Sequence, residues 1–107
     1  MTMGATVVTY TVEPENAEEL HARIRDHLVP AARQAAGYRG FLLLDQGEAQ
    51  RLAIVLFESV ELAMKAQSVI DPVSAEHIYA LMSSPSVGSL STVVFGDGVF
   101  GEMPPSL

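Results

Sequence analysis

The sequence predicts an α+β domain with the ferredoxin-like order β-α-β-β-α-β, in which a four-stranded antiparallel sheet carries its helices on one face. Strand-forming runs and helical periodicities alternate in that order along the 107 residues. The strand-forming runs are apolar on both faces, which is typical of strands that are covered on both sides. The length fits one domain. We therefore expect a single domain over residues 1–107, with a core at about 5–95 and a C-terminal tail at 96–107.

The first strand and the first helix follow from two different periodicities. Valine, threonine and tyrosine alternate over Ala5–Val12, which predicts a strand. Apolar residues then recur at helical spacing over Asn16–Ala36, with Asn16 as the expected cap. Pro30 removes one backbone hydrogen bond from this helix, so we expect a kink near His27.

The middle of the chain predicts a hairpin. Arg39–Asp45 and Arg51–Glu58 each contain a continuous apolar run, and a polar segment separates them. We expect two strands joined by a loop longer than a tight turn. Neither strand alternates apolar with polar residues, so both faces of each strand should be covered.

The last third of the chain predicts a divided helix and a final strand. Ser59 can cap a short helix from Val60 to about Gln67, and Asp71-Pro72 can start a second segment. Val87–Phe95 has the composition of a strand. After it we expect a turn at residues 96–98, a short strand or partner-reaching segment at 99–100, and a frayed tail at 103–107.

Composition excludes several functional classes. The chain has no cysteine, which removes disulfides, thiolate metal sites and cysteine nucleophiles. Its net charge of -7 opposes binding to nucleic acid and to anionic membranes. No apolar run reaches the ~20 residues that a membrane span needs. The first residues lack a signal-peptide pattern, so we expect a cytoplasmic protein.

The apolar content predicts a partner. Hydrophobic residues make up 49% of the chain, which is more than the core of one small domain readily buries. Two helices cover only one face of a four-stranded sheet. The simplest cover for the other face is the same face of a second copy, which predicts a homodimer.

Four segments of the chain resemble a known family. They are Glu13–Leu20 at the start of the first helix, Leu28–Ala32 near its end, Gly37–Phe41 entering the second strand, and Phe57–Glu61 leaving the third. Together they are similar to the antibiotic biosynthesis monooxygenase family, which consists of small dimeric α/β-barrel proteins. The resemblance covers about residues 5–95, and its motifs specify fold more than activity.

The resemblance implies a ligand pocket between the helices and the sheet of each subunit. Some family members oxidise polycyclic phenols with dioxygen and no cofactor, others bind or degrade haem, and related barrels cyclise polyketides. The better-described enzymes use tryptophan and asparagine in the pocket. This chain has no tryptophan, and Asn16, its one asparagine, is explained as a helix cap. The family's catalytic set therefore does not transfer.

His27 is the first candidate for a catalytic group. At about 100° per residue it falls within roughly 60° of the centre of the helical apolar stripe. A neutral histidine there can act as general base toward an acidic phenol. The alternative is a partly buried histidine bonded to a carbonyl that the Pro30 kink exposes.

Two further candidates flank Ile78. By the resemblance, His77 can ligate haem iron, or it can be a half-exposed boundary residue. Tyr79 can orient a substrate oxygen or simply contribute to packing. In a polyketide cyclase, His77 and Tyr79 would enolise a ketone.

Three residues are candidates for substrate binding. Tyr10 can point its hydroxyl into the pocket or into the dimer interface. Arg23 lies about 95° from the centre of the helical stripe and can orient a substrate oxygen. Arg39 can hold an acidic ligand or form a solvated strand end.

Three functional hypotheses remain open. The first is a cofactor-independent monooxygenase acting on an aromatic, quinol or polyketide-type molecule. The second is a polyketide cyclase on the same barrel. The third is a non-catalytic dimer that binds a small hydrophobic molecule or haem. The histidines and acids lack metal-ligand spacing, so we expect no metal site, and haem is the one cofactor considered.

Overall fold

The computed structural model describes residues 2–95, so the expected turn at 96–98, the segment at 99–100 and the tail at 103–107 lie outside the described residues. The elements are, in chain order, β1 (Gly4–Thr11), α1 (Pro14–Arg23), the π-helical turn η1 (Ile24–Leu28), α2 (Val29–Gln34), β2 (Tyr38–Gly47), β3 (Gln50–Phe57), α3 (Val60–His77), the short 3₁₀ helix η2 (Tyr79–Leu81) and β4 (Val87–Thr92).

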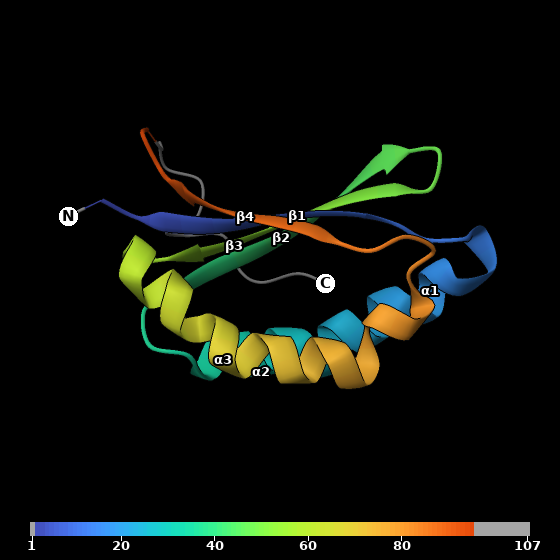
Figure 1. Ribbon diagram of the computed structural model, residues 1–107, viewed down its shortest axis with the longest axis horizontal. Coiled ribbons are helices and arrows are strands. Elements are labelled where there is room, and N and C mark those ends of the chain that lie inside the picture. Colours follow the sequence, from blue (N-terminus) through green and yellow to red (C-terminus); the bar gives the residue numbers. More distant parts are fainter. Residues whose placement is uncertain (1, 96–107) are drawn as a thin grey trace.

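The sheet has the predicted ferredoxin-like topology. Its strand order is β2-β3-β1-β4, and every neighbouring pair is antiparallel. All the helices lie on one face of this sheet (Figure 1). The fold class predicted from the sequence is therefore confirmed, although β4 ends at Thr92 rather than at Phe95.

The β2–β3 hairpin is tighter than expected. Gly47 pairs with Gln50, which leaves a two-residue turn at Glu48 and Ala49. Both residues have positive φ, at 51° and 67°, as the type I′ turns of tight hairpins require. The expectation of a longer loop is wrong because both strands continue through the polar segment, with a bulge between Asp45 and Gly47.

The first helical region begins earlier than predicted and contains a wide turn. Pro14 occupies the first helical turn, where its missing N–H costs nothing, and Glu13 rather than Asn16 stands at the cap. The backbone N–H of Val29 donates to the carbonyl of Ile24, an i to i−5 bond that defines the π turn. The turn precedes Pro30, whose ring would clash with the carbonyl four residues earlier in a regular helix.

The second helical region is one helix, α3, and the predicted division is wrong. Ser59 caps it as expected, accepting a hydrogen bond from the Leu62 amide at 3.2 Å. Asp71 is not a cap, because α3 continues through Pro72 to His77. A buried stripe of small and apolar side chains holds both halves against the sheet, and this packing outweighs the hydrogen bond lost at the proline. The stripe consists of Ala63, Ala66, Ile70 and Ser74.

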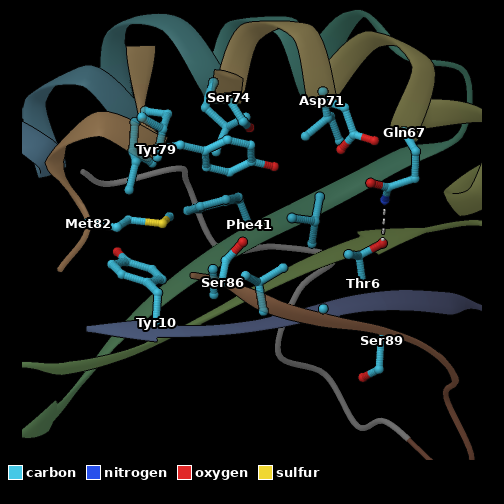
Figure 2. Close-up of a pocket in the computed structure, with 18 of the residues that line it drawn as sticks. Thr6, Tyr10, Phe41, Gln67, Asp71, Ser74, Tyr79, Met82, Ser86 and Ser89 are labelled. Carbon is cyan, nitrogen blue, oxygen red and sulfur yellow. Dashed lines mark hydrogen bonds between the residues drawn. The ribbon is translucent and has the colours of Figure 1, made fainter. Parts of the chain in front are cut away.

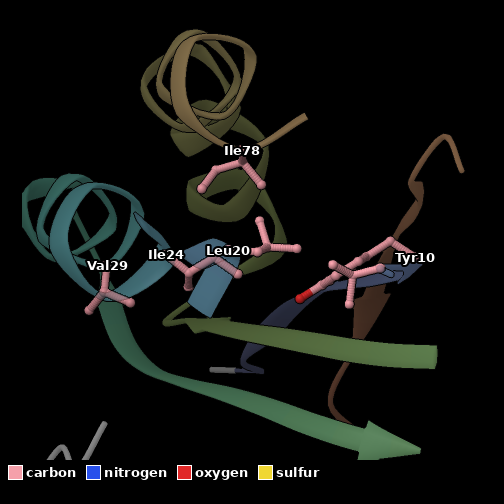
Figure 3. Packing of buried hydrophobic residues seen from close by; sticks show 6 residues of the cluster. Tyr10, Leu20, Ile24, Val29 and Ile78 are labelled. Carbon is pink, nitrogen blue, oxygen red and sulfur yellow. The ribbon is translucent and has the colours of Figure 1, made fainter. Parts of the chain in front are cut away.

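The core between the helices and the sheet is split into two clusters. One lies around α1 and contains Tyr10, Val12, Leu20, Ile24, Val29 and Ile78 (Figure 3). The other lies between α2, α3 and β3 and contains Ala32, Val55, Phe57, Ala63, Ala66 and Ile70. Leu28 and Phe41 are packed against both clusters. Residues of both clusters border one cavity between the helices and the sheet.

The face of the sheet that points away from the helices is also apolar. Side chains alternate along each strand, so the residues paired in one row share a face. One row on this outer face contains Leu42, Ile54 and Val7, and the next contains Leu44, Leu52 and Thr9. Leu44 is 41% exposed. Among the described residues, no helix has the length and apolarity needed to cross a membrane.

Candidate functional site

A cavity of about 480 Å³ lies between the helices and the sheet. It is bounded by Tyr10, Ile24 and Ile78 from one core cluster and by Val55 and Ile70 from the other. Small residues keep the space open, because Ala53, Ser74 and Gly88 lie where larger side chains would close it. Figure 2 shows the cavity with α3 above and the strands below.

Tyr10 lines the cavity with its side chain, and its hydroxyl group is buried. Its side chain comes from β1 and is 4% exposed, and no described residue hydrogen-bonds its hydroxyl. Burial raises the pKa of Tyr10 to about 12, and the nearby Arg51 guanidinium partly opposes this shift. The hydroxyl therefore stays protonated near neutral pH. Of the two predicted orientations, the structure shows the one toward the helices and the cavity.

The helix α3 contributes a polar stripe. Gln67, Asp71 and Ser74 are spaced four and three residues apart and all line the cavity. The Gln67 amide donates to the Thr6 hydroxyl of β1 at 3.2 Å, which ties α3 to the sheet at one end of the cavity. Asp71 brings a carboxylate to the same wall.

Tyr79 also lines the cavity, as expected for a residue that can orient a ligand oxygen. It begins the short helix η2 directly after α3 and is 44% exposed. In Figure 2 its ring extends under Ser74 with the hydroxyl directed toward the side of Asp71. Tyr10 and Tyr79 are thus the two predicted site residues that the structure brings together at the cavity.

His27 lies outside the cavity lining and is exposed, so the expectation that it is the most inward ionisable group of its helix is wrong. The cause is the π turn. Buried positions step by four residues from Leu20 to Ile24, by five to Val29 and by three to Ala32. The five-residue step rotates His27 away from the core, because the prediction assumed regular α-helical spacing.

His77 is also outside the cavity lining. Its ring stacks on that of His27, with centroids 3.9 Å apart and planes 3° from parallel. Its Nε2 lies 3.7 Å from a carboxylate oxygen of Glu76. The two histidines therefore join the two helical regions away from the cavity. The described cavity lining contains no histidine, so its residues do not fit a histidine-ligated haem.

The two predicted binding arginines are engaged elsewhere. Arg23 forms an ion pair with Glu19 at 3.1 Å and donates to the carbonyl of His77 at 3.0 Å. Its charge therefore meets the negative end of the α3 dipole. Arg39 is exposed at the irregular start of β2, with Glu58 at 3.9 Å. Neither arginine lines the cavity.

A second, smaller recess lies between α1 and the β2–β3 hairpin. Arg51, whose side chain is 11% exposed, bonds Asp45 at 3.0 Å and donates from Nε to Nε2 of His21 at 3.3 Å. Burial, and then the Arg51 charge, lower the pKa of His21, while Asp45 opposes the shift. Within residues 2–95 no group of three or more acids or histidines is arranged to hold a metal ion.

Comparison with known proteins identifies the fold. No protein-family model matches the chain, and no curated protein matches its sequence.

Solved structures do match. SnoaB, a cofactor-independent oxygenase from Streptomyces nogalater, superposes with a TM-score of 0.72 at 17% identity, over 89% of this chain and 96% of its own. A Bordetella bronchiseptica protein provisionally assigned as an antibiotic biosynthesis monooxygenase gives 0.75 at 18% identity, over 89% and 100%. The chain has the fold of the antibiotic biosynthesis monooxygenases.

The same monooxygenase fold occurs in a Nitrosomonas europaea protein of unknown function, NE2512. It matches with a TM-score of 0.75 at 17% identity, over 99% of this chain and 98% of its own. The sequence resemblance to this fold is therefore confirmed at the level of structure. Identities this low establish the fold and leave activity to be argued from the site.

Sequence reasoning missed Asp71, Gln67 and Ser74 as residues of the site. The signal was present in the spacing of these residues, which continues to Ile78 on one helical face. It was hidden because Pro72 suggested a helix start, which made Asp71 a cap. A continuous helix through the proline would have placed all four residues on the same wall.

Proposed function

We propose that this protein is a cofactor-independent oxygenase that oxidises a polycyclic hydroxyaromatic or polyketide-type molecule with dioxygen. The observation that carries the proposal is the apolar cavity of about 480 Å³ between the helices and the sheet. A cavity of about 150 Å³ holds one benzene ring. The space is therefore about three times larger, which suits a molecule of several fused rings.

The chemistry requires little from the protein beyond binding and proton transfer. An anthrone-type substrate loses two hydrogens from one ring carbon, and that carbon gains one oxygen atom as a carbonyl. The other oxygen atom leaves as water, so the substrate itself supplies all four electrons. The cavity would exclude bulk water and hold the substrate as its anion, which is the form that reacts with dioxygen.

The tyrosines suit such a ligand. Tyr79 offers a hydroxyl on the helix side that can orient an oxygen of a hydroxyaromatic molecule. Tyr10 lines the strand side of the cavity with its ring, while its hydroxyl is buried. The position of His27, which is exposed and outside the cavity lining, does not support its predicted role as base.

The homodimer belongs to the same proposal. The outer face of the sheet presents Leu42, Ile54 and Leu52, and the described residues include no helix that covers it. A second copy of the same face would cover these side chains in an isologous contact. Each subunit would keep its own cavity on the opposite side of its sheet.

The test is oxygen uptake with a panel of anthrones and hydroquinones. We expect wild-type protein to consume oxygen and form the quinone. Gly88→Leu should reduce the rate roughly tenfold or more, because a misfit of a few methylene groups costs that much. Gly88 pairs with Val8, whose side chain lines the cavity, and a Cβ at position 88 meets only ordinary contacts.

Gly88→Ala is the matched control, because its single methyl group leaves most of the space open. It should keep the wild-type rate. A product formed equally well without oxygen would indicate a cyclase instead. Tight binding of the panel with no turnover would indicate a non-catalytic binder, and either result contradicts the oxygenase.

A further inference from the structure

Apart from Tyr10, two residues with polar side chains are buried among the described residues, and both line the cavity. They are Thr6 of β1, which is 8% exposed, and Ser74 of α3, which is 6% exposed. A buried polar side chain normally has a hydrogen-bonding role, because an apolar residue would pack there without desolvating a hydroxyl group. Thr6 is the more informative of the two, since its hydroxyl group is bonded to Gln67, which also lines the cavity.

The row of the sheet that contains Thr6 is otherwise apolar. Thr6 pairs with Val55 on β3 and with Leu90 on β4, and Val55 pairs with Phe41 on β2. Residues paired in one row share a face of the sheet, and all four line the cavity. A ligand that lies along this row therefore meets carbon atoms everywhere except at Thr6.

Gln67 reaches Thr6 from the helix side. Its amide nitrogen donates to the Thr6 hydroxyl at 3.2 Å, and Figure 2 shows the two side chains meeting at one end of the cavity, away from Tyr10. This bond uses only part of their capacity, because Gln67 keeps its carbonyl oxygen and a second N–H, and the Thr6 hydroxyl keeps its proton. Among the described residues, neither side chain makes a further hydrogen bond.

Filling the cavity changes the solvation of this pair. Gln67 is partly exposed, so water reaches it in the empty protein. An apolar ligand would displace that water and leave the amide oxygen of Gln67 and the proton of Thr6 without partners, which opposes binding. A ligand hydroxyl group can donate to the amide oxygen and accept from Thr6. The pair therefore favours a ligand that carries a hydroxyl group at this end of the cavity.

We propose that Gln67 and Thr6 form a polar subsite that selects, among polycyclic aromatic molecules, those with a hydroxyl group on a terminal ring. The proposed subsite rests on the ligand class of the proposed function. Both side chains are neutral, and together they offer donors and an acceptor, so they suit a protonated hydroxyl group better than a carboxylate. They fix which ring enters this end of the cavity and take no part in the transfer of protons or oxygen.

Equilibrium binding under nitrogen tests the subsite without any oxidation. The ligands are anthracene, 2-methoxyanthracene and 2-hydroxyanthracene, which share one ring system and differ at a terminal ring. The chain has no tryptophan, so the fluorescence of the ligand reports its binding directly. Wild-type protein should bind 2-hydroxyanthracene roughly tenfold or more tightly than anthracene, because anthracene leaves the polar pair unpaired. The methyl ether cannot donate a hydrogen bond and should gain less than the hydroxyl group.

Two variants each remove one half of the pair. Gln67→Met keeps a long, helix-forming side chain, and Thr6→Val keeps a β-branched, strand-forming one. Each should lower the preference for 2-hydroxyanthracene over anthracene by roughly fivefold, through loss of one hydrogen bond to the ligand. The double variant should bind the two ligands about equally.

Matched controls are Ser68→Ala, on α3 next to Gln67, and Thr9→Val, on the same strand as Thr6. Neither residue lines the cavity, and the Ser68 hydroxyl donates to the carbonyl of Lys65 at 2.9 Å. Both controls should keep the wild-type ratio of affinities. The ratio separates recognition from structure, because loss of a purely structural tie between α3 and the sheet would change both affinities together.

A wild-type ratio close to one, a ratio that either variant retains, or failure to bind all three ligands would overturn the subsite. The result is independent of oxidation. A hydroxyl preference that is lost in the variants, in a protein that takes up no oxygen with any anthrone or hydroquinone, would contradict the oxygenase and leave the subsite standing. Oxygen uptake by a protein without any hydroxyl preference would do the reverse.

Discussion

At the scale of single residues, Tyr10 has a hydroxyl group whose burial lowers stability. Its ring completes the α1 cluster, while its hydroxyl has no partner among the described residues. A phenylalanine at this position would fill the same space without burying a hydroxyl group. The buried hydroxyl therefore lowers the stability of the folded chain.

Tyr10→Phe should stabilise the ligand-free protein. The change keeps the ring and removes the unsatisfied hydroxyl, so the free energy of unfolding should rise by about 1 kcal/mol. For a domain of this size that raises Tm by roughly 4–6 °C. Calorimetry of the ligand-free protein measures this shift. A lower Tm than wild type would mean that the hydroxyl already has a partner in the empty cavity.

The direction of a side chain could be predicted from the sequence in a strand, where side chains alternate. It could not be predicted in the first helical region, where the number of residues per turn changes. The sequence left Tyr10 with two orientations, toward the pocket or toward the dimer interface, and the structure places its side chain in the cavity lining. His27 was misplaced, because one extra residue in a turn changes the direction of every later side chain. Pro30 indicated an irregularity near His27, but a proline does not reveal that the irregularity is one extra residue in a helical turn.

At the scale of elements, three prolines in the two helical regions have three different effects on the helices. Pro14 begins a helix, Pro30 follows a π turn and Pro72 lies inside α3. Local propensity predicts a break or a start for each. Which one occurs depends on whether a buried stripe continues beyond the proline, and that is a property of the packed molecule.

The contact between α1 and the β2–β3 hairpin should make stability depend on pH. The pKa of His21 is lowered in the folded protein, so the unfolded chain binds more protons between that lowered value and the ordinary pKa of about 6.5. The contribution of neutral His21 to the free energy of unfolding is therefore fully present above about pH 6.5. It is lost as the pH falls below 6.5 and through the lowered pKa that His21 has in the folded protein. Protonated His21 would face the charge of Arg51 and lose the hydrogen bond from it.

Urea unfolding between pH 8 and 5 measures this dependence. His21→Gln should flatten the curve, since glutamine can accept the bond from Arg51 without titrating. His21→Ala should flatten it as well but start from a lower stability at pH 8, because Arg51 loses an acceptor. An unchanged slope in both variants would assign the acid sensitivity to other groups.

At the scale of the whole molecule, the sequence was sufficient for topology and insufficient for the cavity. The order of strands and helices follows from periodicity, and the two-sided apolar strands followed from composition. The cavity depends on the coincidence of Ala53, Ser74 and Gly88 from three elements in space. No local pattern encodes that coincidence, and only the assembled fold reveals it.

The dimer is the remaining prediction at this scale. Ile54 lies in the central row of the outer face, between Leu42 and Val7. Ile54→Lys should leave a folded monomer, because the lysine reaches water in a single subunit but would be buried unpaired in an isologous dimer, twice by symmetry. An unpaired buried charge costs about 2–5 kcal/mol, so the dimer should weaken by roughly 100-fold or more.

Sedimentation velocity across micromolar concentrations measures the association, and circular dichroism verifies that each variant is folded. Val69→Lys is the control, since Val69 is an apolar residue of α3 that is 42% exposed and not part of the sheet. That variant should remain dimeric. A wild-type protein that sediments as a monomer would contradict the prediction, and the apolar rows of the outer face would then need a different cover. Oxygen uptake by folded Ile54→Lys monomers would further show that each cavity works within one subunit, as expected for a site enclosed by its own helices and sheet.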